Sequence, residues 1–188
     1  MTDSEVKYCI ANEGPALFVV GNVQANLSSD TFDYNYASYD NSDDYSGKGG
    51  AIFFNCTNLY CAVQFIQNNK FSHNRADIAG GAHYFSEMPY IFFDTSTTYY
   101  NNSATYGNNQ AAYPVSIEFY DEVSSESILS TYFSSDRRLQ SLPLLPEIYS
   151  VLTSGSVITP IPVMQILDEY GQVVSSDNSS YILIILNL

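Results

Sequence analysis

Three cysteines and two histidines are the residues of this 188-residue chain best suited to covalent or metal chemistry. Cys56 and Cys61 enclose Thr-Asn-Leu-Tyr, a spacing at which a disulfide pins a short excursion between two strands. A zinc site is the weaker alternative, because it needs four ligands and His73 and His83 have no paired spacing. The sequence therefore predicts a Cys56–Cys61 disulfide. Cys9 is left as a free thiol or as the partner of a cysteine elsewhere.

Asparagines in the pattern Asn-x-Ser/Thr could accept N-linked glycans. The pattern occurs at Asn26, Asn55, Asn101 and Asn178. In a chain rich in Asn and Ser, about one or two are expected by chance, so all four together with a disulfide favour a glycosylated protein at the cell surface or outside the cell. Asn178, in the turn-like Ser-Asp-Asn-Ser-Ser, is expected to be exposed.

An acidic loop at residues 37–46 brings together oxygen ligands from Asp40, Asn41, Asp43 and Asp44. It lacks the glycine and the final glutamate that a calcium-binding EF-hand loop requires, so a solvated loop is expected. Calcium binding by this loop stays open. No metal or other cofactor is assigned.

The net charge of −14, with only 6 Lys and Arg, argues against nucleic acid and anionic membrane surfaces as partners. No apolar run is long enough to span a bilayer, so membrane insertion is not expected. The first residues lack the features of a signal peptide, which for an exported protein indicates a mature chain or a segment of a longer one.

The elements that must position these residues are copies of one repeat. Its opening is seen in Gly14-Pro-Ala-Leu-Phe, Gly49-Gly-Ala-Ile-Phe and Gly80-Gly-Ala-His-Tyr, with a weaker fourth copy from Tyr106-Gly107. Its close is an aromatic residue, then Asn three positions on, then Ala two positions further. The alanines Ala16, Ala51 and Ala82 lie about 35 and about 31 residues apart, a spacing typical of repeat architectures.

Short apolar bursts rich in aromatic and β-branched residues, separated by Gly, Asn and Ser, indicate strands rather than helices. A repeat of two or three short strands must stack on its neighbours to bury its apolar face. We therefore expect a parallel β-helix, right-handed because of strand twist and crossover preference. Asn68 and Asn69, Ser29 and Asp30, and Ser96 and Thr97 are expected at its corners. The glycines are expected to take positive φ and to pass close to the next coil.

The repeat, Gly-Gly-Ala-[Ile/Leu]-[Phe/Tyr] followed by Asn-Asn-x-Phe-x-x-Asn-x-Ala, resembles the Pmp-type repeats of right-handed parallel β-helix proteins, most closely large ciliate cell-surface proteins. The resemblance covers roughly residues 14–119 and implies a secreted or surface-displayed protein with a structural or adhesive role. The first copy departs from the pattern, with Gly14-Pro15 in place of Gly-Gly and no Asn pair.

Parallel β-helices also include polysaccharide lyases and hydrolases, which need carboxylates on one exposed sheet. The strands of residues 51–93 carry almost no acid, and no Gly-x-Ser-x-Gly elbow occurs, so we do not expect an enzyme. A carbohydrate-binding or adhesion module is the other alternative. Its aromatic surface would come from Tyr34, Tyr36, Tyr84, Tyr90, Tyr99 and Tyr100, although stacked aromatics are more often core or ladder contacts.

The expected domains are β-helix repeats over residues 1–120, a linker over 121–146 and β-sandwich-like strands over 147–188. Before the first coil, residues 1–13 read as a polar lead-in with one strand, 6–11. In the last segment strands are expected at 148–152, 157–158, 161–167 and 181–186. The phrase around Asp168-Glu-Tyr-Gly171 resembles immunoglobulin-like modules, in which it forms a hairpin. The segment is too short for a whole sandwich, so another segment or chain must complete it.

These features predict a non-catalytic structural protein, the repeating subunit of a glycosylated extracellular fibre. A short β-helix has two open ends, and no amphipathic helix is predicted to cap either one. The apolar C-terminal strand is expected to add to the open edge of the next copy, which gives a head-to-tail homopolymer. This assembly strand consists of Tyr181, Ile182, Leu183, Ile184, Ile185 and Leu186.

Overall fold

The computed structural model describes residues 1–41, 46–55, 62–86, 90–93, 95–121, 127–132 and 162–175. Every regular element within these ranges is a β-strand, as the sequence predicts. In the same ranges, no helix is long and apolar enough to cross a membrane.

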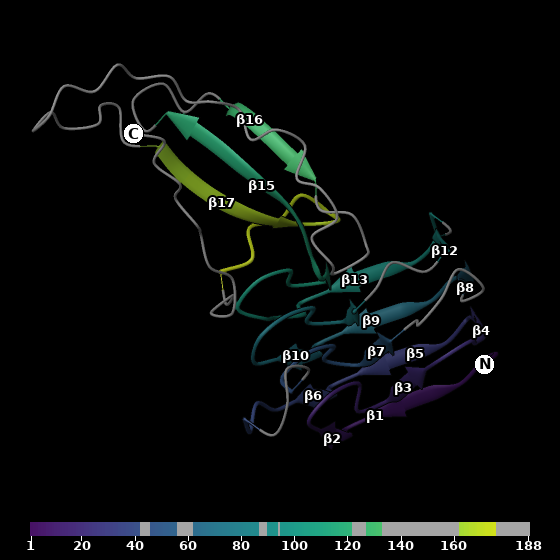
Figure 1. The fold of residues 1–188 in the computed structure, drawn as a ribbon. Coiled ribbons are helices and arrows are strands. Elements are labelled where there is room, and N and C mark those ends of the chain that lie inside the picture. The colour runs from purple at the N-terminus through teal and green to yellow at the C-terminus, as the bar shows by residue number, and fades with distance from the viewer. Residues whose placement is uncertain are drawn as a thin grey trace, which may run out of the picture.

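The strands up to Ala112 form parallel sheets, in which each strand pairs with the equivalent strand of the neighbouring repeat (Figure 1). One sheet contains β1 (Glu5–Lys7), β5 (Thr31–Asp33), β9 (Lys70–Ser72) and β13 (Thr98–Tyr100). A second contains β2 (Ile10–Ala11), β6 (Tyr36–Ala37) and β10 (Arg75–Ala76). A third contains β3 (Leu17–Val20), β7 (Ile52–Asn55), β11 (His83–Phe85) and β14 (Gln110–Ala112). A fourth contains β4 (Gln24–Ser28), β8 (Ala62–Gln67) and β12 (Tyr90–Phe93).

Because the chain visits these sheets in the same order in each repeat, every repeat is one coil, and the coils form a stack consistent with a parallel β-helix. The predicted register is confirmed at the alanines of the repeat opening. Ala16 N–H donates to Ala51 O at 2.9 Å, and Ala51 N–H donates to Ala82 O at 2.8 Å. The weaker fourth opening also joins the stack, since Tyr106 bridges to Ala79 and β14 pairs with β11.

The residues before the first predicted coil also belong to the stack. The single strand expected at residues 6–11 is two strands, because the chain turns a corner at Tyr8, where φ is 58°. β1 pairs with β5 and β2 pairs with β6. This lead-in therefore forms part of an additional coil at the N-terminal end of the stack.

The interior of the stack is built from rows of aromatic rings. Phe32, Phe71 and Tyr99 stack at centroid distances of 4.8 and 5.5 Å, close to the spacing of adjacent strands. Phe54 and Phe85 stack in a second row at 5.1 Å. Each fully buried phenylalanine contributes roughly 1.5–3 kcal/mol from apolar burial. Because the rings of one coil are buried against those of the next, each coil depends on its neighbours for this stabilisation.

The paired glycines have two different roles. Gly49 and Gly80 have φ of 69° and 67°, which an L-residue rarely adopts. Gly50 and Gly81 allow close approach of the backbone, since a Cβ on Gly50 would lie 2.1 Å from Gly81 O. Both roles agree with the sequence-based prediction.

Two rows of buried polar side chains hold the corners of the stack. Asn69 accepts from Asp30 N–H at 3.1 Å and donates to Leu27 O at 3.0 Å. In the second row, Asn74 accepts from Asn35 N–H at 3.1 Å, and Asn74 N–H donates to the next asparagine of the row, Asn102.

The predicted corners are confirmed at Ser29 and Asn68, which have φ of 57° and 51°. A second set of left-handed corners was not predicted. It contains Tyr8, Tyr34, His73 and Asn101.

After Ala112 the chain leaves the stack and forms an antiparallel sheet (Figure 1). Its central strand β15 (Pro114–Asp121) pairs with β16 (Ser127–Tyr132) and β17 (Pro162–Asp168). The strand expected at 161–167 corresponds to β17, whereas β16 lies in the expected linker. Within the described ranges this is one sheet without a second sheet facing it, so a sandwich is not seen. The strands expected at 148–152, 157–158 and 181–186 lie outside these ranges.

Candidate functional site

Several residues with predicted functions lie outside the described ranges. They are Cys56, Cys61, Asn178 and the whole assembly strand from Tyr181 to Leu186. Residues 42–45 of the acidic loop, including Asp43 and Asp44, are also outside, whereas Asp40 is described and accepts from Ser46 Oγ at 2.9 Å. Cys9 is a half-buried free thiol, with its Sγ 3.6 Å from Lys7 O. The predicted disulfide, the Asn178 glycan and the assembly strand therefore stay predictions.

The other three glycosylation candidates differ in exposure. Asn26 on β4 and Asn101 at a corner are exposed. Asn55 is half-buried at the end of β7, and its Oδ1 accepts from Ser86 Oγ at 2.9 Å. Asn26 and Asn101 are therefore the better placed of the three for modification.

The structure brings together Asp33, Ser72 and His73, which sequence reasoning did not group. Asp33 Oδ1 lies 2.7 Å from Ser72 Oγ and 3.1 Å from His73 Nδ1. Burial acts to raise the pKa of Asp33, but the hydrogen bonds from Ser72 and His73 and the charges of His73 and Lys7 outweigh it and hold the pKa below its ordinary value. The serine donates to the carboxylate and not to the imidazole, so the arrangement differs from that of an activated nucleophile.

His83 is buried inside the stack. Burial lowers the pKa of its imidazole to about 3, so the ring is neutral at pH 7. Its Nε2 lies 2.9 Å from Tyr99 Oη. In the described part of the chain, no three His, Cys, Asp or Glu side chains are grouped as metal ligands would be.

The tyrosines proposed as a sugar-binding surface differ in burial where the structure describes their side chains. Tyr84 is buried on β11, and Tyr99 belongs to an interior row of rings. Tyr34 and Tyr100 are exposed, but Tyr34 is stacked between Tyr8 and His73 at 5.4 and 4.5 Å. The side chain of Tyr90 is not among those that the structure describes. Tyr34 packs at a corner of the stack, and Tyr84 and Tyr99 pack against the core.

The N-terminal end of the stack presents an open strand edge. β3 ends its sheet and pairs only with β7 among the described strands. Phe18 and Val20 on β3 are 49% and 50% exposed. Tyr8 and Ile10 of the N-terminal lead-in are also exposed apolar side chains. We call these four residues and the outer edge of β3 the N-terminal edge surface.

The opposite end of the stack is partly capped by the turn that follows β17, so the expectation of two open ends is wrong there. Asp168 Oδ2 accepts from Ala112 N–H on β14 at 3.0 Å, and Gln172 Nε2 donates to Gln110 O at 2.8 Å. These side chains take the place of the next coil's backbone groups. A hairpin supplies the cap without any amphipathic helix.

The predicted hairpin at Asp168 is confirmed by its backbone. Gly171 N–H donates to Asp168 O at 2.9 Å, and Gly171 has a φ of 70°. Burial raises the pKa of the Asp168 carboxyl, although hydrogen bonds from the backbone N–H groups of Gln172, Ala112 and Tyr170 oppose this. The carboxyl is thus held between the hairpin and the last coil.

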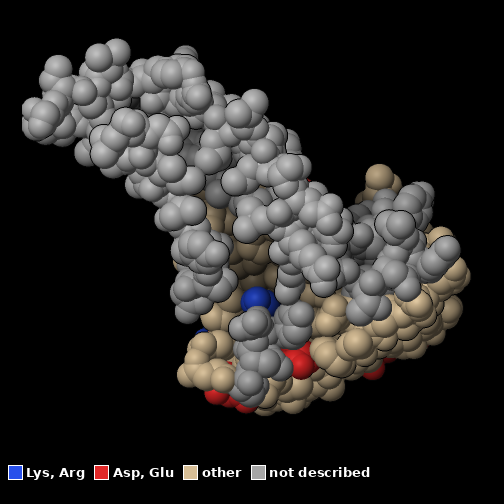
Figure 2. All heavy atoms as spheres, viewed as in Figure 1, with Lys and Arg blue, Asp and Glu red and all other residues tan. Residues whose placement is uncertain are grey.

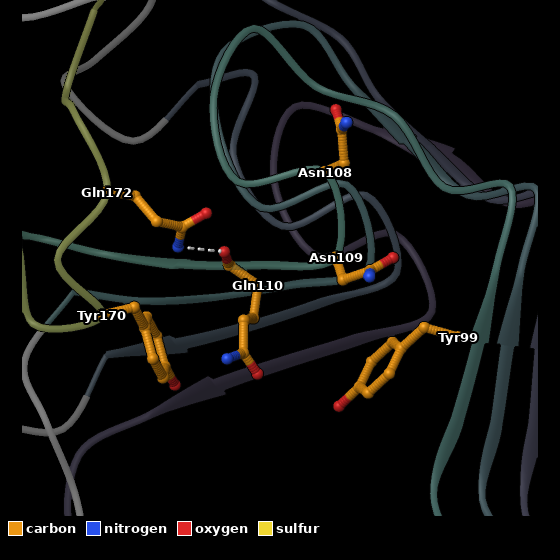
Figure 3. A pocket seen from close by; sticks show the side chains of 6 residues that line it. All are labelled: Tyr99, Asn108, Asn109, Gln110, Tyr170 and Gln172. Carbon is orange, nitrogen blue, oxygen red and sulfur yellow. Dashed lines mark hydrogen bonds between the residues drawn. The ribbon is translucent and has the colours of Figure 1, made fainter.

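A polar hollow of about 500 Å³ lies between this hairpin and the last coil (Figure 3). We call it the terminal hollow. It is lined by Tyr99, Asn108, Asn109, Gln110, Tyr170 and Gln172. Figure 3 shows the Gln110 side chain directed between the rings of Tyr99 and Tyr170. None of these lining residues is charged.

Few charges interrupt the visible part of the described surface. Figure 2 shows several acidic groups along the lower edge, which Figure 1 identifies as the N-terminal end of the stack, and isolated Lys or Arg groups above that edge. Comparison of the chain with protein-family models, curated proteins and solved structures finds no match in any of the three.

Proposed function

We propose that this chain is a non-catalytic structural protein of the cell exterior, and that copies of it assemble head to tail through β-strand contacts. The observation that carries the proposal is the open edge of β3. In a parallel sheet, the N–H and C=O groups of every second residue point to the same neighbouring strand, and those of the residues between them point to the opposite side. The groups of β3 that point away from β7 are therefore available to another strand.

A second copy is the proposed occupant of this edge. Residues 181–186, Tyr-Ile-Leu-Ile-Ile-Leu, are uncharged and rich in β-branched residues, as a strand added to an edge requires. The neighbouring Phe18 and Val20 side chains supply an apolar surface against which it packs. Because the two contact regions differ, the contact is heterologous and extends into a filament unless the rotation closes a ring.

The location and finer fold are also part of this proposal. We take the stack to be right-handed, following the crossover preference of parallel strands and the resemblance to Pmp-type repeats. Exposure of Asn26 and Asn101 supports N-linked glycans on its surface. Glycans and the net charge of −14 would limit lateral association between filaments.

The test places a charge on the edge. Val20→Lys should convert assemblies into monomers in light scattering, because a lysine on an edge strand opposes strand addition. Ile66→Lys is the matched control, since Ile66 is 42% exposed but lies on β8, which has strands on both sides. It should still assemble.

Deletion of residues 180–188 should also abolish assembly while the coils stay folded, as measured by circular dichroism. A wild-type chain that is monodisperse at high concentration would contradict the proposal. Assembly that survives both Val20→Lys and the deletion would contradict it equally.

A further inference from the structure

We propose that the terminal hollow, between the last coil and the Asp168 hairpin, is a binding site for an uncharged saccharide. The proposal is independent of head-to-tail assembly, since the hollow lies at the opposite end of the stack from β3. Its volume of about 500 Å³ falls within the range of roughly 300–1,000 Å³ typical of small-molecule sites.

The hydrogen-bond network fixes which way two of the lining asparagines point. Asn108 Oδ1 accepts from Ala104 N–H at 3.2 Å. Asn109 Oδ1 accepts from Asn102 Nδ2 at 3.2 Å, and Asn102 is itself fixed because its Oδ1 accepts from Asn74 N–H. Both oxygens are therefore held by the protein, and the Nδ2 groups of Asn108 and Asn109, which are among the residues that line the hollow, are left to donate to a ligand.

The hairpin side of the hollow supplies an acceptor. Gln172 Nε2 donates to Gln110 O at 2.8 Å and to Asp168 Oδ2 at 3.3 Å, so its Oε1 is left for the hollow. The Gln110 side-chain amide adds one donor group and one acceptor (Figure 3). A lining that combines fixed donors with fixed acceptors suits hydroxyl groups, because each hydroxyl both donates and accepts.

Two aromatic rings complete the lining. Tyr99 and Tyr170 face the hollow from the coil and from the hairpin, and both rings are held by the apolar core. Rings of this kind pack against the apolar C–H faces of a sugar while the amides bind its hydroxyls. None of the described lining residues is cationic and the chain carries −14, so phosphorylated or carboxylated ligands are disfavoured.

The test is a titration followed by amide ¹H–¹⁵N spectra, with the methyl glycosides of glucose, galactose, mannose and N-acetylglucosamine as neutral probes and glucuronate as the charged probe. At least one neutral probe should saturate with a Kd on the order of 1 mM, a value that few polar contacts supply. The shifted signals should be the side-chain amides of Asn108, Asn109, Gln110 and Gln172. Glucuronate should bind about tenfold more weakly.

Two variants, each with a matched control, locate the binding. Gln110→Met keeps the side-chain length but removes the amide, and Gln64→Met makes the same change on the exposed face of β8. Asn108→Asp keeps the acceptor for Ala104 N–H but replaces the donor by a charge, and Asn22→Asp is its exposed control.

The two hollow variants should weaken binding about tenfold or more, whereas the controls should not change it. If Gln110→Met unfolds, the exposed Asn108→Asp variant still decides the question. Absence of saturation with every neutral probe, or equal binding by wild type and Asn108→Asp, would overturn the assignment and leave a hollow filled by water.

Discussion

The backbone N–H of Ala112 donates to Oδ2 of Asp168 at 3.0 Å, although the two residues are 56 positions apart. Ala112 ends the last strand of the coil stack, and its N–H would otherwise face a missing neighbour. The carboxylate also accepts from the N–H groups of Tyr170 and Gln172 at 2.9 Å each. One side chain thus fixes the hairpin and closes part of the strand edge that would recruit another chain.

Replacing this carboxylate by an amide should loosen the cap. In Asp168→Asn, an NH₂ group replaces one of the two carboxylate oxygens, and this group cannot accept a hydrogen bond from a backbone N–H. The backbone N–H left without an acceptor costs about 1–3 kcal/mol. Hydrogen exchange of the Ala112 amide should speed up about tenfold or more. Glu169→Gln, an exposed neighbour in the same turn, is the control and should leave that exchange rate unchanged. Equal rates in wild type and Asp168→Asn would show that the bond does not hold the cap.

The asparagine row should be a second sensitive feature. Asn74 accepts from Asn35 N–H and donates to Phe32 O at 2.9 Å, in the buried interior. Asn74→Ala leaves these groups without partners, so the free energy of unfolding should fall by about 3 kcal/mol or more in a urea titration. Asn22→Ala, at an exposed bend, should change it by less than about 0.5 kcal/mol. A similar small loss in both variants would argue against a structural role for the row.

The coil stack could be predicted from the sequence, because equivalent residues of successive repeats stack on one another. Ala16, Ala51 and Ala82 hydrogen-bond in the predicted register, and Gly50 lies where a side chain would clash. Asn68 takes the predicted left-handed corner. In each case one residue type satisfies a backbone requirement that recurs in every coil.

The cap and the hollow were not predicted, because they depend on contacts between segments with no shared repeat. Gln172 Nε2 donates to Gln110 O although the two residues are 62 positions apart, and no motif around either residue predicts the contact. The second corner escaped prediction for another reason. Tyr34 and His73 have positive φ, which is uncommon for residues other than glycine, and stacking of their rings at 4.5 Å accompanies that backbone.

If the protein is exported, as proposed, two covalent modifications are expected. In protein purified from its native source, Asn178 and at least one other sequon should carry glycan, and Cys56 should be bonded to Cys61. Exposure makes Asn26 and Asn101 better candidates than Asn55. Intact mass before and after deglycosylation, with and without reduction, measures both modifications. Unmodified asparagines together with two free thiols would instead indicate a cytosolic protein.

Stability should fall in acid because of His83. Burial lowers the pKa of its imidazole to about 3 in the folded chain, whereas an unfolded histidine has a pKa of about 6.5. Between these values the unfolded state binds a proton that the folded state does not, so the free energy of unfolding decreases as pH falls from about 6.5 toward 3. The slope due to this group is at most about 1.4 kcal/mol per pH unit.

His83→Phe should remove that slope. The phenyl ring keeps most of the contacts with Phe65, Phe71 and Phe85, although it loses the bond to Tyr99. Urea unfolding of both proteins at pH 7, 5.5 and 4 measures the effect, and the stability difference between wild type and variant should shift in favour of the variant as pH falls. His73→Gln is the control, since it leaves His83 in place and should retain the His83 contribution. Parallel wild-type and His83→Phe profiles across this range would mean that the buried imidazole does not set the acid sensitivity of the coil stack.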